Sequence, residues 1–200
     1  IGEGIGRFAG LNASLVHAIS EDDLIQLLST RGGIDLDRWW ALAELMREEG
    51  LALEAQGDEV GAQRAFAKSL RLGLEVLAEA EDVPSYLDVS GLELVIDQTF
   101  DQPMTAATRA ELINYLTNTG RLDRAENLVL WAIDEQQSDA ERLAGLFYER
   151  LTRLTDEELE AGGLSREEAN DGHLQHPPPA PVPEAEFEDD DDEDVDDIFG

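Results

Sequence analysis

The sequence of 200 residues contains no cysteine and only one lysine, Lys68, among its 14 basic residues. The absence of cysteine excludes disulfides, thiol nucleophiles and thiolate metal ligands. No hydrophobic run in the sequence approaches the roughly 20 residues that span a bilayer. No segment combines the basic, apolar and small-residue zones of a signal peptide. We therefore expect a cytoplasmic protein with no part in a membrane.

Basic residues are scarce relative to acidic ones. The 46 Asp and Glu residues give the chain a net charge of −32. Eleven of these carboxylates lie in residues 184–200, which leaves −21 for residues 1–183. Such a field repels nucleic-acid phosphates and anionic lipids and attracts basic partners. We expect no direct binding of nucleic acid, and a protein or peptide partner that is basic or apolar.

Glycine, proline and charge divide the chain into four segments. Residues 1–10 are rich in glycine and expected to be flexible, and because the chain begins at Ile1 we expect further sequence before it. Residues 11–154 are predicted to form a helical-repeat domain, followed by short helical turns over 155–169. We expect residues 170–200 to be disordered, with a proline-rich linker before an acidic tail that buries too little apolar surface to fold.

The body of the chain has helical periodicity throughout. Apolar residues recur at spacings of three and four, which is typical of amphipathic helices. Four Ser or Thr residues with an acidic residue three positions later predict helix starts, at Ser20, Ser138, Thr155 and Ser165. The main predicted helices cover residues 11–19, 37–56, 59–80, 85–100, 105–118 and 122–135, with another beginning near 138. No segment alternates as a strand does, so we predict an all-α protein.

Two helix–turn–helix hairpins carry the strongest pattern. The first places Met46, Gly50, Leu53, Gly57, Ala62 and Phe66, and the second Leu112, Leu116, Gly120, Ala125 and Ala132, at tetratricopeptide-like spacing. Small residues let helix backbones approach closely, and Gly57 and Gly120 suit the turns. The two turn glycines are 63 residues apart, so the array is degenerate. We predict antiparallel tetratricopeptide-like hairpins in an α-α superhelix, with a generic helical bundle as the alternative.

Part of the chain resembles an uncharacterised bacterial family of helical-repeat proteins. The likeness is carried by Leu11–Gly33, by Asp35–Arg38 and by Leu42–Gly50. Residues 116–121 and 125–127 are similar to the second hairpin of that family. The resemblance covers about residues 11–135. It implies a tetratricopeptide-like fold and brings no agreed activity, catalytic residue or cofactor.

In tetratricopeptide proteins the first helix of each hairpin lines a concave groove. By position, the partner-binding candidates here are Arg47, Leu51, Glu54, Asn114, Thr117 and Asn118. A groove that captures a peptide carboxylate needs at least two basic residues, and Arg47 is the only one among these candidates. The groove therefore favours a basic or apolar peptide, while the alternative is that these residues form solvated helix faces.

The tryptophans suggest either core positions or anchors for a partner. Trp39 and Trp40 are adjacent in a predicted helix, where neighbouring side chains diverge by about 100°. We therefore expect one of them to point inward, against the helix that carries Leu24 and Leu28, and the other to lie nearer the surface. Trp131 falls in an apolar stripe and is predicted to be in the core.

The acidic tail ends in an apolar tip. Its segment 196–200 resembles the acidic, Phe-tipped peptides that bacterial single-stranded-DNA-binding proteins present to repair enzymes, although Gly200 follows the phenylalanine. Phe187, Ile198 and Phe199 are candidate anchors of a docking peptide. The alternative is a tail that only keeps the protein soluble.

Residues suited to catalysis are few. The three histidines are His17 in an early helix and His173 and His176 near the tail. We expect His17 to be a packed or surface histidine and not a general base. A metal site at His173 and His176 would be weak, because the flexible segment fixes no ligand shell. We expect no enzyme, metal or cofactor, and predict an interaction module that acts as an adaptor or scaffold. The rival prediction is an acidic regulator that mimics nucleic acid and binds a basic protein.

Overall fold

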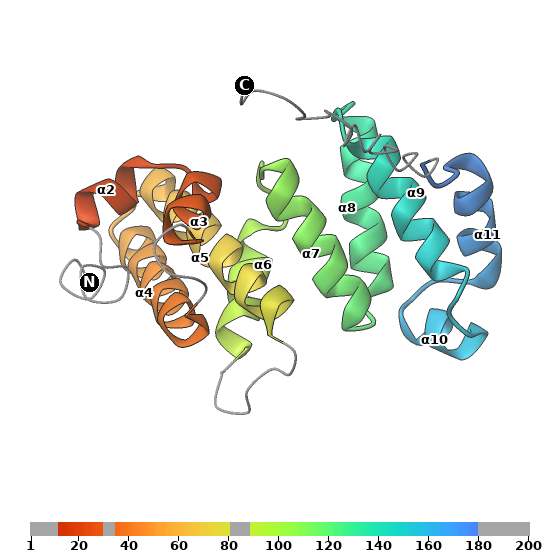
Figure 1. Cartoon of the computed structure of the whole chain (residues 1–200), viewed down its shortest axis with the longest axis horizontal. Coiled ribbons are helices and arrows are strands. Elements are labelled where there is room, and N and C mark those ends of the chain that lie inside the picture. The colour runs from red at the N-terminus through yellow and green to blue at the C-terminus, as the bar shows by residue number, and fades with distance from the viewer. Residues whose placement is uncertain (1–11, 30–34, 81–88, 180–200) are drawn as a thin grey trace, which may run out of the picture.

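The computed structural model describes residues 12–29, 35–80 and 89–179. Within these ranges the chain forms ten α-helices and no strand, which confirms the all-α class. Figure 1 shows the helices following one another in an elongated array from α2 to α11. They are α2 (Ala13–Ala18), α3 (Glu21–Ser29), α4 (Leu36–Ala55), α5 (Glu59–Glu79), α6 (Ser90–Thr99), α7 (Ala106–Asn118), α8 (Leu122–Asp134), α9 (Ala140–Leu151), α10 (Asp156–Ala161) and α11 (Arg166–Gln175).

Helices α4 and α5 form the most extensive helix pair. Gly57 makes the turn between them with a φ of +80°, a left-handed conformation that glycine adopts at little cost. Asp58 then caps α5 by accepting a hydrogen bond from the Gly61 N–H at 3.0 Å. Gly50 is buried, and a Cβ added to it would lie 2.5 Å from the Phe66 ring. Close approach at a small residue, expected from the sequence, therefore holds for this hairpin.

Helices α7 and α8 form a second antiparallel pair with the same local features. Gly120 has a φ of +73° in the turn. The predicted apolar positions face inward: Leu112, Leu116, Ala125 and Ala132 are all fully buried. Local sequence therefore places both turns and both buried faces correctly.

Helix α5 holds the N-terminal half together. It packs against α3, α4, α6 and α7. From α7 onward each helix packs against one that follows it in the chain: α7 against α8, α8 against α9, and α9 against α11. Among the described residues, no helix combines the length and apolarity needed to cross a membrane.

Side-chain caps confirm three of the four predicted helix starts. Ser20 accepts a hydrogen bond from the Asp23 N–H, and Thr155 and Ser165 form complete capping boxes with Glu158 and Glu168. The prediction for Ser138 was wrong. The chain makes a further turn there, closed by the Ala140 N–H and the Gln137 carbonyl at 3.1 Å, and α9 begins only after Asp139.

The placement of the tryptophans also differs from prediction. Trp39 and Trp40 are both buried, so the expectation that one lies nearer the surface was wrong. Trp131, expected in the core, is 36% exposed. Its ring lies over the Arg109 guanidinium, 5.3 Å from ring centroid to guanidinium carbon, so a charged group occupies the inner side of this indole.

Helix α11 extends the folded region past the predicted boundary. Residues 170–175 are helical, so their assignment to the disordered tail was wrong. Their composition is polar, and a tertiary contact explains the helix: Gly172 packs against the Tyr148 ring of α9, where an added Cβ would lie 2.1 Å from Cε1. His176 also stacks on Tyr148, with 5.9 Å between ring centroids. The flexible start at 1–10 and the tail from residue 180 onward lie outside the described residues.

Candidate functional site

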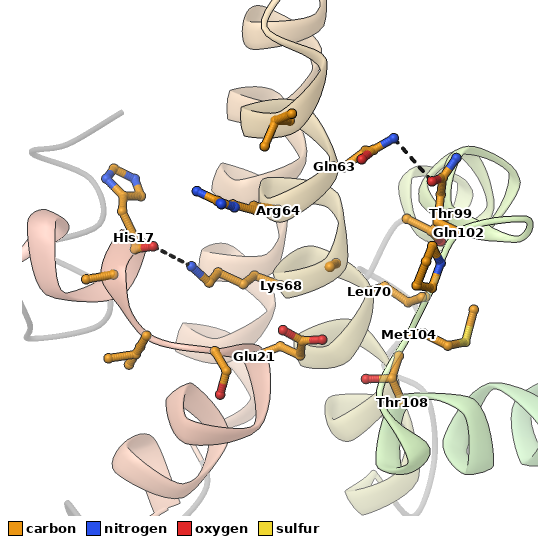
Figure 2. A pocket seen from close by; sticks show the side chains of 16 residues that line it. His17, Glu21, Gln63, Arg64, Lys68, Leu70, Thr99, Gln102, Met104 and Thr108 are labelled. Carbon is orange, nitrogen blue, oxygen red and sulfur yellow. Dashed lines mark hydrogen bonds between the residues drawn. The ribbon is translucent and has the colours of Figure 1, made fainter. Parts of the chain in front are cut away.

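A pocket of about 610 Å³ opens along α5. Figure 2 shows α5 at its floor, with the end of α2 and the start of α3 on one side and the α6–α7 connection on the other. We call it the α5 pocket; it is lined by His17, Ala18, Ile19, Ser20, Glu21, Val60, Gln63, Arg64, Ala67, Lys68, Leu70, Thr99, Gln102, Pro103, Met104 and Thr108. Its volume is typical of sites for small ligands.

The polar floor of the α5 pocket consists of Arg64 and Lys68. These residues are four positions apart in one helix, so their side chains lie on the same face. A smaller cavity of about 250 Å³ also borders His17, Arg64 and Lys68 and adds Glu49. The two cations therefore separate two neighbouring hollows. At one end of the larger hollow, Gln63 donates a hydrogen bond to Gln102 across 3.2 Å.

Lys68 is buried although it is charged. Its residue is 5% exposed, and its Nζ donates to the His17 carbonyl at 3.0 Å, as Figure 2 shows. Burial lowers the pKa of the Lys68 ammonium below its usual 10.5, and the Glu21 and Glu49 carboxylates act in the opposite direction. The His17 ring instead contacts the Glu49 carboxylate, with 3.0 Å between its Nε2 and the carboxylate oxygen.

The lowered pKa of Lys68 can be measured directly. Because Lys68 is the only lysine in the sequence, feeding ¹³C-lysine gives one Cε signal from these 200 residues. We expect its NMR titration midpoint below 10.5, and a further decrease in Glu21→Gln, which removes a carboxylate that favours the ammonium. The unfolded chain then binds more protons between the lowered pKa and 10.5, so the free energy of unfolding should rise with pH in that window.

Glu48→Gln is the matched control for this titration, since Glu48 pairs with Arg47 instead. A midpoint at or above 10.5 in the unmodified protein would contradict the burial of this ammonium.

Most cations of this acidic chain are neutralised locally. Eight of the twelve basic residues in the described ranges pair with a carboxylate: Arg38, Arg47, Arg71, Arg109, Arg121, Arg124, Arg153 and Arg166. In the same ranges, no carboxylate lies within ion-pair distance of Arg64, Lys68, Arg142 or Arg150. Two of these four residues are neighbours on the floor of one pocket.

The groove residues predicted from the sequence have different environments. Thr117 is buried and donates to the Ile113 carbonyl at 2.7 Å, so its assignment to a binding groove was wrong. Arg47 pairs with Glu44 and Glu48 and lies against Gly91 of α6. Glu54 and Asn114 are exposed, Leu51 is half-buried against the core, and Asn118 accepts a hydrogen bond from Arg150. A role in partner binding for these five stays a prediction.

The remaining candidates are the histidines and the anchors of the acidic tail. No group of three or more His, Asp or Glu residues in the described part of the chain could hold a metal ion. His176 instead contacts the Glu141 carboxylate at 3.0 Å. The tail anchors Phe187, Ile198 and Phe199 lie outside the described residues.

Sequence reasoning missed Arg64 and Lys68, although a local signal was present. In a chain with 46 acidic residues, basic residues four apart on a helix are expected to alternate with carboxylates. The positions three and four residues before Arg64 are Gly61 and Val60, and those after it are Ala67 and Lys68. What the sequence could not show was that α2, α3 and the α6–α7 connection enclose this face.

The fold and the α5 pocket define an all-helical protein with a ligand-sized cavity between its helices. The sequence profile of a family of unknown function, DUF6483, matches residues 41–175, and the chain belongs to that family. The match includes α5 with Arg64 and Lys68, but not the wall formed by α2 and α3. Neither a curated protein nor a solved structure matches the chain.

Proposed function

We propose that this protein is a non-catalytic interaction module, a cytoplasmic adaptor or scaffold of bacterial origin built from tetratricopeptide-like hairpins. Its partner is a protein or peptide with an apolar anchor and a basic surface around it. The net charge of −32 supports the basic part of this description, because a cationic partner is attracted over long range.

The exposed apolar face of α8 carries the proposal. Leu130 and Trp131 are adjacent large apolar side chains, 42% and 36% exposed. Exposed tryptophan is enriched among residues that dominate binding energy at interfaces. The cation–π contact with Arg109 fixes the Trp131 ring on its inner side and leaves the outer side open. This face therefore offers a pre-oriented anchor.

Polar groups surround the anchor and favour a partner with a positive charge close to its apolar side chain. Asn127 and Asp134 lie one helical turn before and after it and are both exposed. A partner that places an apolar side chain on Trp131 and a cation near Asp134 matches this arrangement.

The proposal is tested by capture with the full chain from a lysate of the source organism, followed by affinity measurements on the purified partner. We expect Trp131→Ala to weaken binding at least about tenfold, as truncation of an anchor does. Leu15→Ala is the control, since Leu15 is an apolar residue of α2 that is exposed to a similar extent, 41%. Unchanged affinity in Trp131→Ala would overturn the α8 face as the binding site.

Salt dependence separates this proposal from nucleic-acid mimicry. Binding through an apolar anchor should persist when the ionic strength rises from 0.1 M to about 1 M, where the Debye length shrinks to about 3 Å. Two results together would favour nucleic-acid mimicry: complete loss of binding in high salt, and an affinity of Trp131→Ala equal to that of the unmodified protein. Deletion of residues 184–200, measured in the same assay, shows how much the acidic tail contributes to the binding affinity.

A further inference from the structure

The α5 pocket combines an apolar wall with a cationic floor. Leu70 and Ala67 of α5 and Pro103 and Met104 of the α6–α7 connection supply apolar surface. Arg64 and Lys68 supply the charge, and Figure 2 shows both side chains extending between α5 and the α2–α3 segment. A ligand that fits must therefore present both an apolar part and a group that accepts hydrogen bonds from the N–H donors of these two residues.

The two cations have unused donor capacity. The Lys68 ammonium has three N–H donors and uses one, toward the His17 carbonyl. Arg64 has five N–H donors, and among the described residues it makes no hydrogen bond or ion pair. Arg64 and Lys68 also repel each other, since like charges four positions apart on a helix destabilise it. Two like charges at neighbouring positions of one helix face are locally unfavourable, and unfavourable local arrangements of this kind are expected at functional sites.

The charge balance of the lining specifies the charge of the ligand. Within the α5 pocket the two cations face one carboxylate, Glu21, at the opposite wall. Glu49, which also acts on Lys68, lines the smaller neighbouring cavity and contacts the His17 side chain. The ionised groups that line the pocket therefore sum to a single positive charge when His17 is neutral. A monoanion neutralises this lining, whereas a phosphate dianion would leave excess negative charge next to Glu21.

We propose that the α5 pocket is a binding site for a small organic carboxylate, held by Arg64 and Lys68, with its short apolar chain against Leu70, Pro103 and Met104. The planar Arg64 fork suits a carboxylate, and Lys68 adds a charge-assisted hydrogen bond. Glu21 competes with the ligand for Lys68. The site is separate from the α8 face, so either one can fail without the other.

Binding is measured by titrating sodium pentanoate into the full chain labelled with ¹³C-lysine and following the Lys68 Cε signal at constant ionic strength. We expect a saturable shift. Pentanamide, which has the same shape without the charge, and sodium chloride should produce none. Arg64→Gln should weaken pentanoate binding about tenfold, the loss of one charge-assisted contact. Arg142→Gln is the control, because Arg142 is the other arginine without a partner among the described residues and lies on α9.

Glu21→Gln supplies a test of opposite sign. Removal of the competing carboxylate should tighten pentanoate binding several-fold, an effect that a variant which merely perturbs the fold would not produce. Both Arg64 and Glu21 are at least partly exposed, and unchanged helicity by circular dichroism verifies that the variants fold.

Four results would overturn the proposal. Equal shifts with pentanamide would make the pocket a purely apolar cavity. Saturable binding of inorganic phosphate without binding of pentanoate would assign it to phosphate. Binding of a carboxylate-bearing peptide without binding of pentanoate would assign it to a macromolecular partner. Equal affinities of Arg64→Gln and the unmodified protein would remove Arg64 from the site.

Discussion

Arg109→Met is expected to lower the free energy of unfolding by about 3 kcal/mol. Arg109 is 1% exposed, and its Nη1 lies 3.5 Å from the carboxylate of Asp139, which is itself only 15% exposed. Methionine replaces the aliphatic part of the arginine and fills a similar volume. Most of the cost therefore arises from the Asp139 carboxylate, which stays in a poorly hydrated site without its cation. The cation–π contact between Arg109 and Trp131 is lost as well.

The hydrogen bonds around Arg109 are incomplete, which makes the result informative. The Arg109 Nε and the Asp139 Oδ2 are buried and have no protein partner within the described part of the chain. The contact from Nη2 to the Met104 carbonyl is long, at 3.5 Å. The pair is thus held mainly by charge. Replacing both members by uncharged residues should be tolerated better than removing one.

A double-mutant cycle checks this interpretation. Urea denaturation followed by circular dichroism gives the free energy of unfolding, and Arg109→Met/Asp139→Asn should recover at least about 1 kcal/mol of the loss. Arg153→Met is the control, because Arg153 is 72% exposed in its pair with Glu149 and exposed pairs contribute about 0–1 kcal/mol. Two results would contradict the expected role of the pair. One is a smaller loss of unfolding free energy in Arg109→Met than in Arg153→Met, and the other is a double variant whose loss equals the sum of the two single losses.

Local signals determined the features that the sequence predicted well. The turn glycines Gly57 and Gly120 both have positive φ, and the capping boxes at Thr155 and Ser165 are complete. Each of these depends on a few consecutive residues and on backbone hydrogen bonds within one turn. Such features are nearly independent of the rest of the fold, so the chain could be divided correctly into most of its helices.

Burial depended on the placement of whole helices and was predicted less well. Trp39 and Trp40 point about 100° apart on α4. Both can be buried only because α4 is covered on more than one side, and it packs against both α5 and α6. Trp131 continues an apolar stripe, yet the buried Arg109 lies beneath it. Helical periodicity assigns one inner face to each helix. It therefore predicts neither a helix that is buried on more than one side nor a charged group buried beneath an apolar stripe.

The α5 pocket shows the same limit for a functional site. Arg64 and Lys68 lie on one face of α5, a pattern that the sequence alone does not distinguish from a solvated helix surface. The pocket exists because the α2–α3 segment and the α6–α7 connection, about 80 residues apart in sequence, pack on either side of that face. Thr117, which looked like a groove residue, is instead covered by packing.

Gly50→Val is expected to lower the free energy of unfolding by about 3 kcal/mol. A Cβ at Gly50 would lie 2.5 Å, 2.6 Å and 2.9 Å from three carbons of the Phe66 ring, and real Cβ atoms do not approach this closely. The ring belongs to a residue that is 3% exposed, so it has little space into which it can move. The higher helix propensity of valine relative to glycine offsets only a few tenths of a kcal/mol.

The identity of the clashing group can be verified by making it smaller. Phe66→Leu alone should cost no more than about 1.5 kcal/mol. Gly50→Val/Phe66→Leu should be more stable than the sum of the single variants predicts, by at least about 2 kcal/mol, because the leucine leaves room for the new methyl groups. Ala55→Val is the matched control, since Ala55 is an exposed residue of the same helix. The expected ranking in urea denaturation is therefore Ala55→Val near the unmodified protein, the double variant next and Gly50→Val last. If Gly50→Val were as stable as Ala55→Val, helices α4 and α5 would not approach through this glycine, and the hairpin would lose the contact that sets its spacing.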